Sequence, residues 1–579
     1  MTKDKITSRQ LKSSNASQDL SALISEVIPD KSALVFCATK KNCEETAKAL
    51  CKEISPHHLT IHTQERLQLL EDLRNINGTS SGIFSQTLQL TIPMGIAHHH
   101  AGLTSAERLL LEESFRNKII NVLCCTSTLA AGVNLPASRV IFKTPYVGRD
   151  FLTKSKYAQM SGRAGRAGLD TMGESYLLLN QKRSGEHEKG FALMCGSLET
   201  VRSVLLSDYD GVHYHGVIKL LLECICTQLV TSVEQLPKCL DACFYVHCCN
   251  GDDDHALLQR AIHDSYQYLL QHQFIRQVQQ SPPITTIVQH DEQDDEFTDD
   301  EDEQDEQLKD NTVQLSPTPL GLATFHSSFM ANESNMLYDQ LHSLQKNGII
   351  LQDSLHMCYM SCPLTNLIEP DWMLFMNMFN QLDPTRSLIA KMIGLDESIL
   401  INKVMKRNCD ADQELMARRF FNALILCDHI EERSLFDTCA RYQVAGGAGV
   451  VQSLCESAAQ FSSMVMLFCS RLKLTIMEEA FRRVSKRIGY GVKDDLLQLM
   501  NMDDMDRVSA RVLVENGIQD AHALLTQFSS ARQLYNKLKH VLGVTPIAAS
   551  KILIQSARRC LQRESNRYKS MSDAIELII

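Results

Sequence analysis

Short apolar runs alternate with amphipathic segments along the N-terminal third of the chain. Five runs have the length of a buried strand: SALVFCA (32–38), MGIAHHH (94–100), INVLCCTS (120–127), VIFKT (140–144) and ESYLLL (174–179). Helical spacing lies between them, as in NCEETAKALCKEI (42–54) and TSAERLLLEESFR (104–116), where Thr104 and Glu107 form a capping-box pattern. The alternation predicts a doubly wound α/β lobe with a parallel sheet over residues 31–190.

Beyond residue 190 the apolar spacing is helical almost throughout. The pattern divides the chain into a linker (1–30), the α/β lobe (31–190) and three mostly helical domains (191–330, 331–487 and 488–579). The last domain carries two helix-turn-helix patterns, LLQLMNMDDMDRVSARVLVENGI (496–518) and HVLGVTPIAASKILIQSA (540–557). The predicted fold is therefore an α/β lobe followed by mostly α-helical domains.

Composition limits the class of protein. A chain of 579 residues with 44% hydrophobic residues is long enough for several domains with their own cores. No apolar run reaches the roughly 18 residues of a membrane span, and the N-terminus has no apolar stretch of the signal-peptide type. The 20 cysteines are scattered through apolar segments, which indicates reduced thiols in the cytosol or nucleus. We expect no membrane partner.

The net charge of −11 is concentrated in one segment. Residues 291–310 hold 13 acidic residues and one base, Lys309, so the rest of the chain is close to neutral. Such a self-repelling, low-complexity run predicts a disordered insertion, which we place at 280–312. An inert solvated loop is the favoured interpretation, and a segment that screens basic surfaces is the alternative.

A glycine-rich stretch, QMSGRAGRAG (159–168), carries candidate phosphate ligands. Its glycines let the backbone approach a ligand closely, and Arg163 and Arg166 supply planar, always charged forks that suit phosphate oxygens. Upstream, TSTLAAGVNLPA (126–137) follows a predicted strand, so its hydroxyls and amides lie at the carboxyl end, where ligands bind in open α/β sheets. We expect the two stretches to lie side by side; two unrelated glycine turns are the alternative.

Two groups of histidine and cysteine residues are candidates for a metal site. Three consecutive histidines (98–100) fall in a predicted strand, where neighbouring side chains point to opposite faces, so all three cannot converge on one ion. A second group recurs at helical spacing, but no further ligand pair follows at zinc spacing, and we interpret its cysteines as core residues. That group is Cys239, Cys243, His247, Cys248 and Cys249. We predict no metal site in either place.

Four stretches carry a family resemblance: FCATKKNCE (36–44), HHHAGLTSAER (98–108), TSTLAAGVNLPASRVI (126–141) and QMSGRAGRAGLDTMGES (159–175). They resemble motifs IV, IVa, V and VI of the second RecA-like lobe of superfamily-two helicases. Their order and spacing, together with the helical tail, are similar to the polymerase-theta-like DNA helicase family, which includes helicase POLQ-like proteins and archaeal Hel-type relatives. The resemblance implies a RecA-like lobe followed by a winged helix, a helical ratchet and a helix-hairpin-helix domain.

The resemblance also implies an activity. Members of the family are ATP-dependent helicases that move 3′ to 5′ on single-stranded DNA in recombination and fork repair, which implies the nucleus. ATP and Mg²⁺ are held with a first RecA-like lobe, whereas the match here begins at the second lobe. The phosphate-cradling pattern G-x-x-x-x-G-K-[ST] does not occur in the 579 residues. We therefore expect the C-terminal portion of a helicase, inactive by itself, whose partners are single-stranded and forked DNA and DNA-repair proteins.

Nucleotide-facing residues are carried over position by position. Arg166 matches the arginine finger, Arg163 matches its companion on the γ-phosphate, and Gln159 matches the residue that couples nucleotide state to lobe closure. An arginine finger contributes a factor of about 10³ to 10⁵ to phosphoryl-transfer rates. The glycines and amide that would face the nucleotide from the same side are Gly132, Asn134 and Gly162.

Other positions match DNA contacts of the family. Thr39, His100, Gly102 and Thr126 match positions that hold the DNA backbone through hydroxyls and amides. Between motifs V and VI, residues 144–158 match a β-hairpin that wedges the duplex apart. Tyr146 and Phe151 would stack there on the last base pair, and the alternative is a surface hairpin with buried aromatics.

The helical domains supply further candidates. Phe461 falls where archaeal relatives place a base-stacking tryptophan, and an ordinary core position is the alternative. In the tail, Gly543 would form a hairpin turn, with Lys551 and Arg558 on or near the following helix as phosphate contacts.

Two other functions stay open from the sequence. The chain fits an ATPase-dead DNA-binding or regulatory protein derived from a helicase, because it has no phosphate-cradling pattern. The second function is that of one half of an RNA helicase. The ratchet and helix-hairpin-helix patterns argue against it, because they favour DNA.

Overall fold

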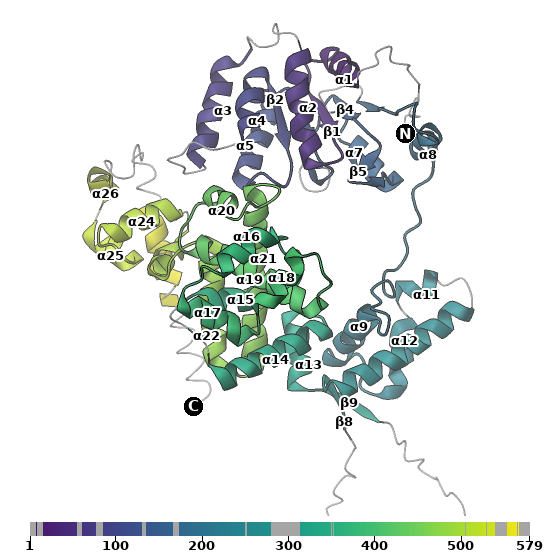
Figure 1. Cartoon of the computed structure of the whole chain (residues 1–579), viewed down its shortest axis with the longest axis vertical. Helices are drawn as coiled ribbons and strands as arrows, with labels where there is room; N and C mark the ends of the chain where they lie inside the picture. The colour runs from purple at the N-terminus through teal and green to yellow at the C-terminus, as the bar shows by residue number, and fades with distance from the viewer. Residues whose placement is uncertain are drawn as a thin grey trace, which may run out of the picture. The chain divides into compact units, whose positions relative to one another are not determined.

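The chain packs as two units in the computed structural model (Figure 1). The first comprises residues 1–200, 350–461 and 483–579, and the second comprises 201–349 and 462–482. The residues that the structure describes are 7, 16–54, 61–76, 85–129, 135–165, 173–241, 243–248, 252–278, 313–348, 350, 353–503, 505–528, 530–538, 553–563 and 565–566.

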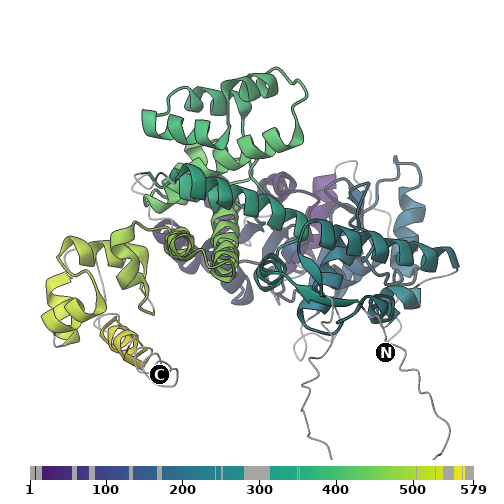
Figure 2. The same cartoon turned by 90° about the horizontal axis from the view of Figure 1, so that it is seen from below.

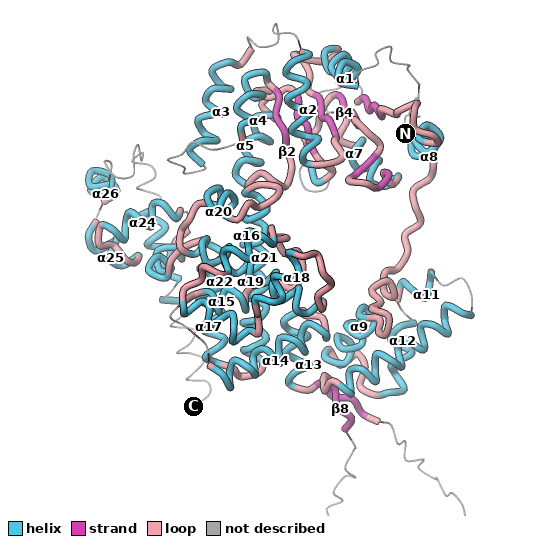
Figure 3. Tube along the Cα trace, in the orientation of Figure 1, coloured by secondary structure: helices cyan, strands magenta, loops and turns pink. Residues whose placement is uncertain are grey.

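A parallel sheet of five strands forms the centre of the lobe, in the order β2-β3-β1-β4-β7. All four neighbouring pairs are parallel. Four strands fall within predicted apolar runs and β4 begins one residue before its run, so the predicted sheet is confirmed (Figure 3). The strands are β1 (Ala33–Phe36), β2 (Ile96–His99), β3 (Val122–Cys125), β4 (Arg139–Phe142) and β7 (Glu174–Leu177).

Helices cover both faces of this sheet. In β1, Ala33 and Val35 belong to one apolar core while Leu34 and Phe36 belong to the other, as the two-residue period of a strand requires. The first core contains α1 (Ala16–Ser25) and α2 (Lys40–Glu53). The second contains α3 (Thr63–Ile76), α4 (Gln86–Thr91), α5 (Ser105–Arg116), α7 (Lys154–Ser161) and α8 (Glu186–Cys195). The doubly wound arrangement is confirmed, and so is the capping box of Thr104 and Glu107 on α5.

The second unit combines helices with one antiparallel hairpin. Its core joins α9 (His215–Cys226) and α12 (Asp252–Gln271) to the hairpin of β8 (Ile275–Val278) and β9 (Gln314–Pro317). Short helices followed by a hairpin agree with the predicted winged helix. The acidic insertion at 280–312 joins the two hairpin strands and lies outside the described residues. The remaining helices are α10 (Leu236–Asp241), α11 (Phe244–Cys248), α13 (Pro319–Ser327) and α14 (Ala331–Asn347).

The rest of the described chain is helical, in green and yellow in Figure 2. The longest of these helices is α21 (Ala448–Arg471), which is followed by α22 (Thr475–Tyr490). Before them come α15 (Leu355–Met360), α16 (Trp372–Phe379), α17 (Pro384–Ile393), α18 (Glu397–Val404), α19 (Ala411–Ile430) and α20 (Leu435–Arg441). The tail contains α23 (Leu497–Met500), α24 (Arg507–Glu515), α25 (Ala521–Gln527), α26 (Ala531–Leu538) and a helical stretch at 553–563. None of the described helices combines the length and apolar character that a membrane crossing needs.

Candidate nucleotide and DNA-backbone sites

The two predicted phosphate-binding stretches lie side by side. The Ala137 amide donates a hydrogen bond to the Arg163 carbonyl at 3.0 Å, and the Gly165 amide donates to the Ala137 carbonyl at 2.7 Å. Ala137 and Ala164 form a parallel β-bridge. The expectation of neighbouring loops is thereby confirmed, and these hydrogen bonds join the two stretches through their backbones.

Glycine is required where this arginine loop closes. Gly165 has φ +96°, in the left-handed region that favours glycine. A Cβ atom on Gly173 would lie 2.4 Å from the Ala164 carbonyl oxygen. The segments that flank residues 166–172 therefore approach each other closer than any side chain allows.

The candidate nucleotide residues differ in their surroundings. Gln159 is exposed on α7, which ends at the cap residue Gly162, and Arg163 follows as a half-buried residue. Gly132, Asn134 and Arg166 lie outside the described residues, so their roles stay predictions.

Three of the candidate DNA-backbone positions gather at one edge of the sheet. Thr39 follows β1, His100 follows β2 and Thr126 follows β3, and these strands are neighbours in the parallel sheet. Thr39 is the exposed N-cap of α2, where its hydroxyl accepts a hydrogen bond from the Asn42 amide at 3.2 Å. The Thr126 hydroxyl lies 2.9 Å from the Thr128 hydroxyl. This edge presents hydroxyls at the carboxyl ends of the strands, as the sequence predicts.

The turn after β2 faces inward. His100 is only 4% exposed, and the Gly102 amide donates to its Nδ1 at 3.0 Å. Gly102 is itself buried, because helix α21 packs against it: the Gly449 amide donates to the Gly102 carbonyl at 3.0 Å. The imidazole of His100 is thus turned away from solvent. The prediction that this turn holds a DNA backbone is therefore kept only for the main-chain groups of the turn.

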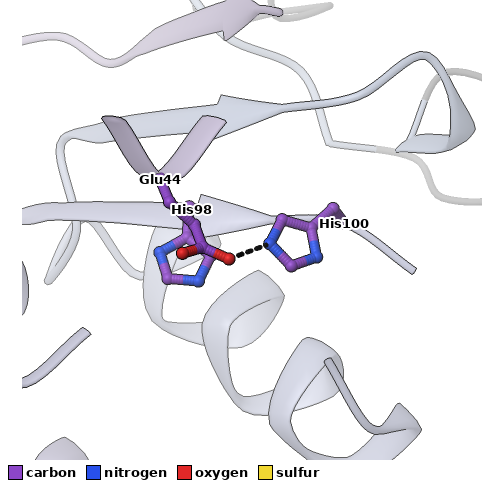
Figure 4. Close-up of side chains that lie close together, drawn as sticks. All are labelled: Glu44, His98 and His100. Atoms are coloured by element: carbon purple, nitrogen blue, oxygen red, sulfur yellow. Dashed lines mark hydrogen bonds and ion pairs between the residues drawn. The ribbon is translucent and has the colours of Figure 1, made fainter. Parts of the chain in front are cut away.

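Two of the three successive histidines share a face with a carboxylate (Figure 4). Among the described residues, donor atoms of Glu44, His98 and His100 lie within 4.8 Å of one another. His99 points to the opposite face, where its Nε2 lies 2.8 Å from a carboxylate oxygen of Glu112. The three histidines therefore do not converge, as expected. His98 and His100 do share one face of the strand, together with Glu44 from α2, a partner that sequence spacing could not reveal.

The hydrogen bonds of this cluster oppose metal binding. Since Nδ1 of His100 accepts from the Gly102 amide, the ring proton of the neutral imidazole lies on Nε2, which then donates to Glu44 at 3.3 Å. A metal ion would need the Nε2 lone pair and a protonated Nδ1. Burial lowers the pKa of His98 to about 3 and that of His100 to about 4, which keeps both rings neutral at physiological pH. We interpret the cluster as a packed, hydrogen-bonded group.

Two residues of the cysteine and histidine group, Cys239 and Cys243, pack against the core of the second unit. Burial raises the pKa of the Cys239 thiol to about 12, which favours the neutral thiol over the thiolate that ligates metals. Cys249 lies outside the described residues. Described cysteines are free thiols, in agreement with the expectation from composition.

The predicted hairpin between the two phosphate stretches is present. Strands β5 (Tyr146–Val147) and β6 (Asp150–Phe151) pair antiparallel. The rings of Tyr146 and Phe151 contact each other edge to face, with centroids 5.4 Å apart, and the Tyr146 hydroxyl donates to Glu186 at 3.1 Å. Both aromatics are half-buried, and Phe151 packs against the apolar core of the lobe, so their stacking on DNA stays a prediction.

Positions predicted in the helical domains are only partly described. Phe461 on α21 is 8% exposed, a core position in this structure. Arg558 is exposed on the helical stretch 553–563, while Gly543 and Lys551 lie outside the described residues.

Comparison with known proteins extends over nearly the whole chain. Residues 332–488 match the DNA_pol_Q helicase like region helical domain, 79–168 the helicase conserved C-terminal domain, and 173–276 a helix-turn-helix domain.

Individual relatives agree. A helicase POLQ-like protein of Homo sapiens is 30% identical over 559 residues, which cover 94% of this chain and 47% of the relative. DNA polymerase theta of Mus musculus is 32% identical over 86% of this chain and 19% of the relative. The ATP-dependent DNA helicase Hel308 of Methanococcus vannielii is 26% identical over 88% of this chain and 64% of the relative. The chain thus spans about half the length of the helicase POLQ-like relatives.

Proposed function

The chain belongs to the polymerase-theta-like DNA helicase family, and on that premise we propose that it forms the C-terminal part of an ATP-dependent helicase moving 3′ to 5′ on single-stranded DNA. The observation that carries the proposal is the pair of backbone hydrogen bonds that joins Ala137 to Arg163 and Gly165. It brings both phosphate-facing stretches to one place beside the sheet, where a nucleotide held by another surface can be reached.

In this proposal the arginine loop completes an ATP site. Arg166 is the finger on the γ-phosphate, Arg163 is its companion, and Gln159 senses closure against the first lobe. Gly132, Asn134 and Gly162 border the nucleotide, which carries Mg²⁺ and is cradled by a lobe of the P-loop type. Arginine forks stabilise the charge that spreads over the transferred phosphoryl group.

DNA lies across the strand ends of the same lobe. The Thr39 and Thr126 hydroxyls and the backbone of the 100–102 turn hold phosphates without sequence preference, which suits a motor that moves along arbitrary DNA. Tyr146 and Phe151 would lie at the duplex junction, and the tail residues Gly543, Lys551 and Arg558 would follow the single strand. The substrates are single-stranded and forked DNA, with DNA-repair proteins as partners in the nucleus.

A DNA-binding protein without ATPase activity is the second candidate, because the 579 residues contain no G-x-x-x-x-G-K-[ST] loop. One experiment separates the two. The purified chain is titrated with a labelled oligo-dT strand at two salt concentrations, and ATP turnover is measured with and without a P-loop lobe from a relative.

We expect weak, sequence-independent binding that falls steeply with salt, because phosphate contacts release counterions. DNA-stimulated turnover should occur only when the P-loop lobe is present. Turnover by the chain alone that disappears in Arg166→Ala would contradict the assignment of the two lobes. No turnover with the lobe, despite normal DNA binding, would favour the second candidate.

A further inference from the structure

Helix α21 meets the candidate DNA-backbone turn end-on. The amide of Gly449, the second residue of α21, donates to the carbonyl of Gly102 at 3.0 Å. In return, Oε1 of Gln452 accepts a hydrogen bond from the amide of Ser105, the first residue of α5, at 2.8 Å. The first amides of any helix have no partner inside the helix. Here the first amides of α21 and α5 each bond to a group on the other segment: Gly449 to the Gly102 carbonyl, and Ser105 to the Gln452 side chain. Ser105 and Gln452 are 347 residues apart in sequence.

The contact leaves no room for side chains. A Cβ atom on Gly449 would lie 2.2 Å from the Leu103 carbonyl oxygen, and one on Gly102 would lie 2.1 Å from the Gly446 carbonyl oxygen. Both clashes are with backbone, which cannot rotate away as a flexible side chain can. Gly446 and Gly447 have φ of +99° and +92°, so the loop before α21 also depends on glycine conformation.

The loop before α21 also lies close to Lys40, beside the second candidate DNA-backbone position, Thr39. A Cβ atom on Gly446 would lie 3.2 Å from Nζ of Lys40, which directly follows the N-cap Thr39 of α2. The segment 446–452 therefore packs against the turn after β2 and lies beside the side-chain ammonium of Lys40, the first residue of α2. These are two of the three places where the lobe presents groups for a DNA backbone.

We propose that Gly449 and Gln452 are positioning residues of the DNA-backbone site, which hold the 100–105 turn in its binding geometry from the helical domain. The inference rests on the proposed function of that turn. Neither residue contacts DNA in this proposal; Gly449 acts through the Gly102 carbonyl and Gln452 acts through the Ser105 amide. A DNA site assembled from the lobe alone would be incomplete, because its turn takes its shape from a helix of another domain.

Four variants of the full 579-residue chain test the proposal by titration with labelled oligo-dT. Gly449→Ala inserts the clashing Cβ atom. Gln452→Met keeps the side-chain length but removes the acceptor for Ser105, together with the exposed hydrogen bond that Nε2 of Gln452 donates to Glu456 at 2.9 Å. Gly489→Ala is the matched glycine control, because its Cβ atom would only touch Ala459 at 3.7 Å. Gln460→Met is the matched control on α21, since Gln460 is exposed.

We expect the oligo-dT affinity to fall about tenfold in Gly449→Ala and about fivefold in Gln452→Met, the effect of one hydrogen bond. Both controls should stay within about twofold of the wild type. Amide exchange at Ser105 should accelerate in both test variants at a temperature where thermal melting shows them folded. Gln452 is half-exposed, so Gln452→Met keeps the test valid if Gly449→Ala does not fold.

Thr39→Ala separates the two levels of the argument. If Thr39→Ala weakens binding while Gln452→Met and Gly449→Ala do not, the positioning role is overturned and the DNA site stands. If Thr39→Ala leaves binding unchanged, the proposed DNA site fails, and the positioning role falls with it. Equal losses in test and control variants would also overturn the positioning role, because they would reflect general destabilisation.

Discussion

Two loops of the lobe carry its candidate chemistry, and they are held in opposite ways. Most of the 100–105 turn is buried, although Ser105 is exposed: His100 bonds to Glu44, Gly102 is covered by α21, and Ser105 is bonded to Gln452. The arginine loop is held through backbone bonds to Ala137, while Gln159 stands in solvent. A site that binds a backbone of constant shape gains from a fixed geometry. A loop that must meet a nucleotide held elsewhere needs a fixed main chain and accessible side chains.

The largest effect should come from the arginine loop. With a P-loop lobe supplied, Arg166→Ala should lower DNA-stimulated ATP turnover by about 10³-fold or more, because it removes the charge that stabilises the transferred phosphoryl group. The oligo-dT affinity should not change. Arg116→Ala, an exposed arginine in the last turn of α5, is the control. A loss of turnover below tenfold would show that the two loops do not divide nucleotide and DNA binding in this way.

A second effect should arise at the amino edge of the sheet, opposite the turn. The buried Arg66 guanidinium donates to the carbonyls of Ile119 at 2.9 Å and Pro93 at 3.2 Å, and to the Asn121 side chain at 3.0 Å. Arg66→Met would leave these acceptors without a partner and should lower the free energy of unfolding by about 3 kcal/mol. Urea denaturation measures this, with the exposed Arg116→Met as control. A change under about 1 kcal/mol would mean that water replaces the guanidinium.

The contrast between the loops also explains what could be read from the sequence. Apolar runs predicted all five strands of the sheet. Strands β1 to β4 are buried along their whole length and leave a continuous apolar signature, while the edge strand β7 is only half-buried. The parallel topology also predicted that the two candidate phosphate-binding stretches, 126–137 and 159–168, lie side by side. The junction of Gly102 with Gly449 could not be predicted, since backbone contacts between segments hundreds of residues apart leave no local pattern. The Glu44 partner of His100 was missed because a side-chain contact between a helix and a strand end, 56 residues apart in sequence, leaves no local pattern either.

Acid should destabilise the folded chain through three buried histidines, of which His100 lies in the turn. Burial holds the pKa of His98 near 3 and the pKa values of His100 and His429 near 4, against 6.5 for an unperturbed histidine. Below pH 6.5 the unfolded chain binds these protons and the folded chain does not. The free energy of unfolding should therefore fall as pH drops from 6.5 to 4, by up to about 1.4 kcal/mol per pH unit for each histidine.

The groups around these histidines do not reverse that sign. Lys40 and Lys48 disfavour protonation of His100 and His98, as Arg507 does for His429, whereas Glu44 faces His100 as the acceptor of its Nε2 proton. His98→Phe keeps a ring against His100 and removes one titrating group. Urea midpoints of the variant should depend less steeply on pH between 6.5 and 4 than those of the wild type. An unchanged slope would show that His98 is protonated in the folded chain.

The smallest effect on DNA binding should come from the far part of α21. Phe461 lies 12 residues beyond Gly449 on this helix, which is about 18 Å at 1.5 Å per residue. Because its ring is buried, Phe461→Leu should lower the free energy of unfolding by about 1 kcal/mol and leave the oligo-dT affinity within about twofold. A base-stacking aromatic would instead contribute about 1–3 kcal/mol per base to binding. Phe468→Leu, a fully buried phenylalanine on the same helix, is the control for loss of packing alone. If Phe461→Leu weakens oligo-dT binding at least fivefold while Phe468→Leu does not, α21 contacts DNA directly, and its role extends beyond holding the turn at its N-terminus.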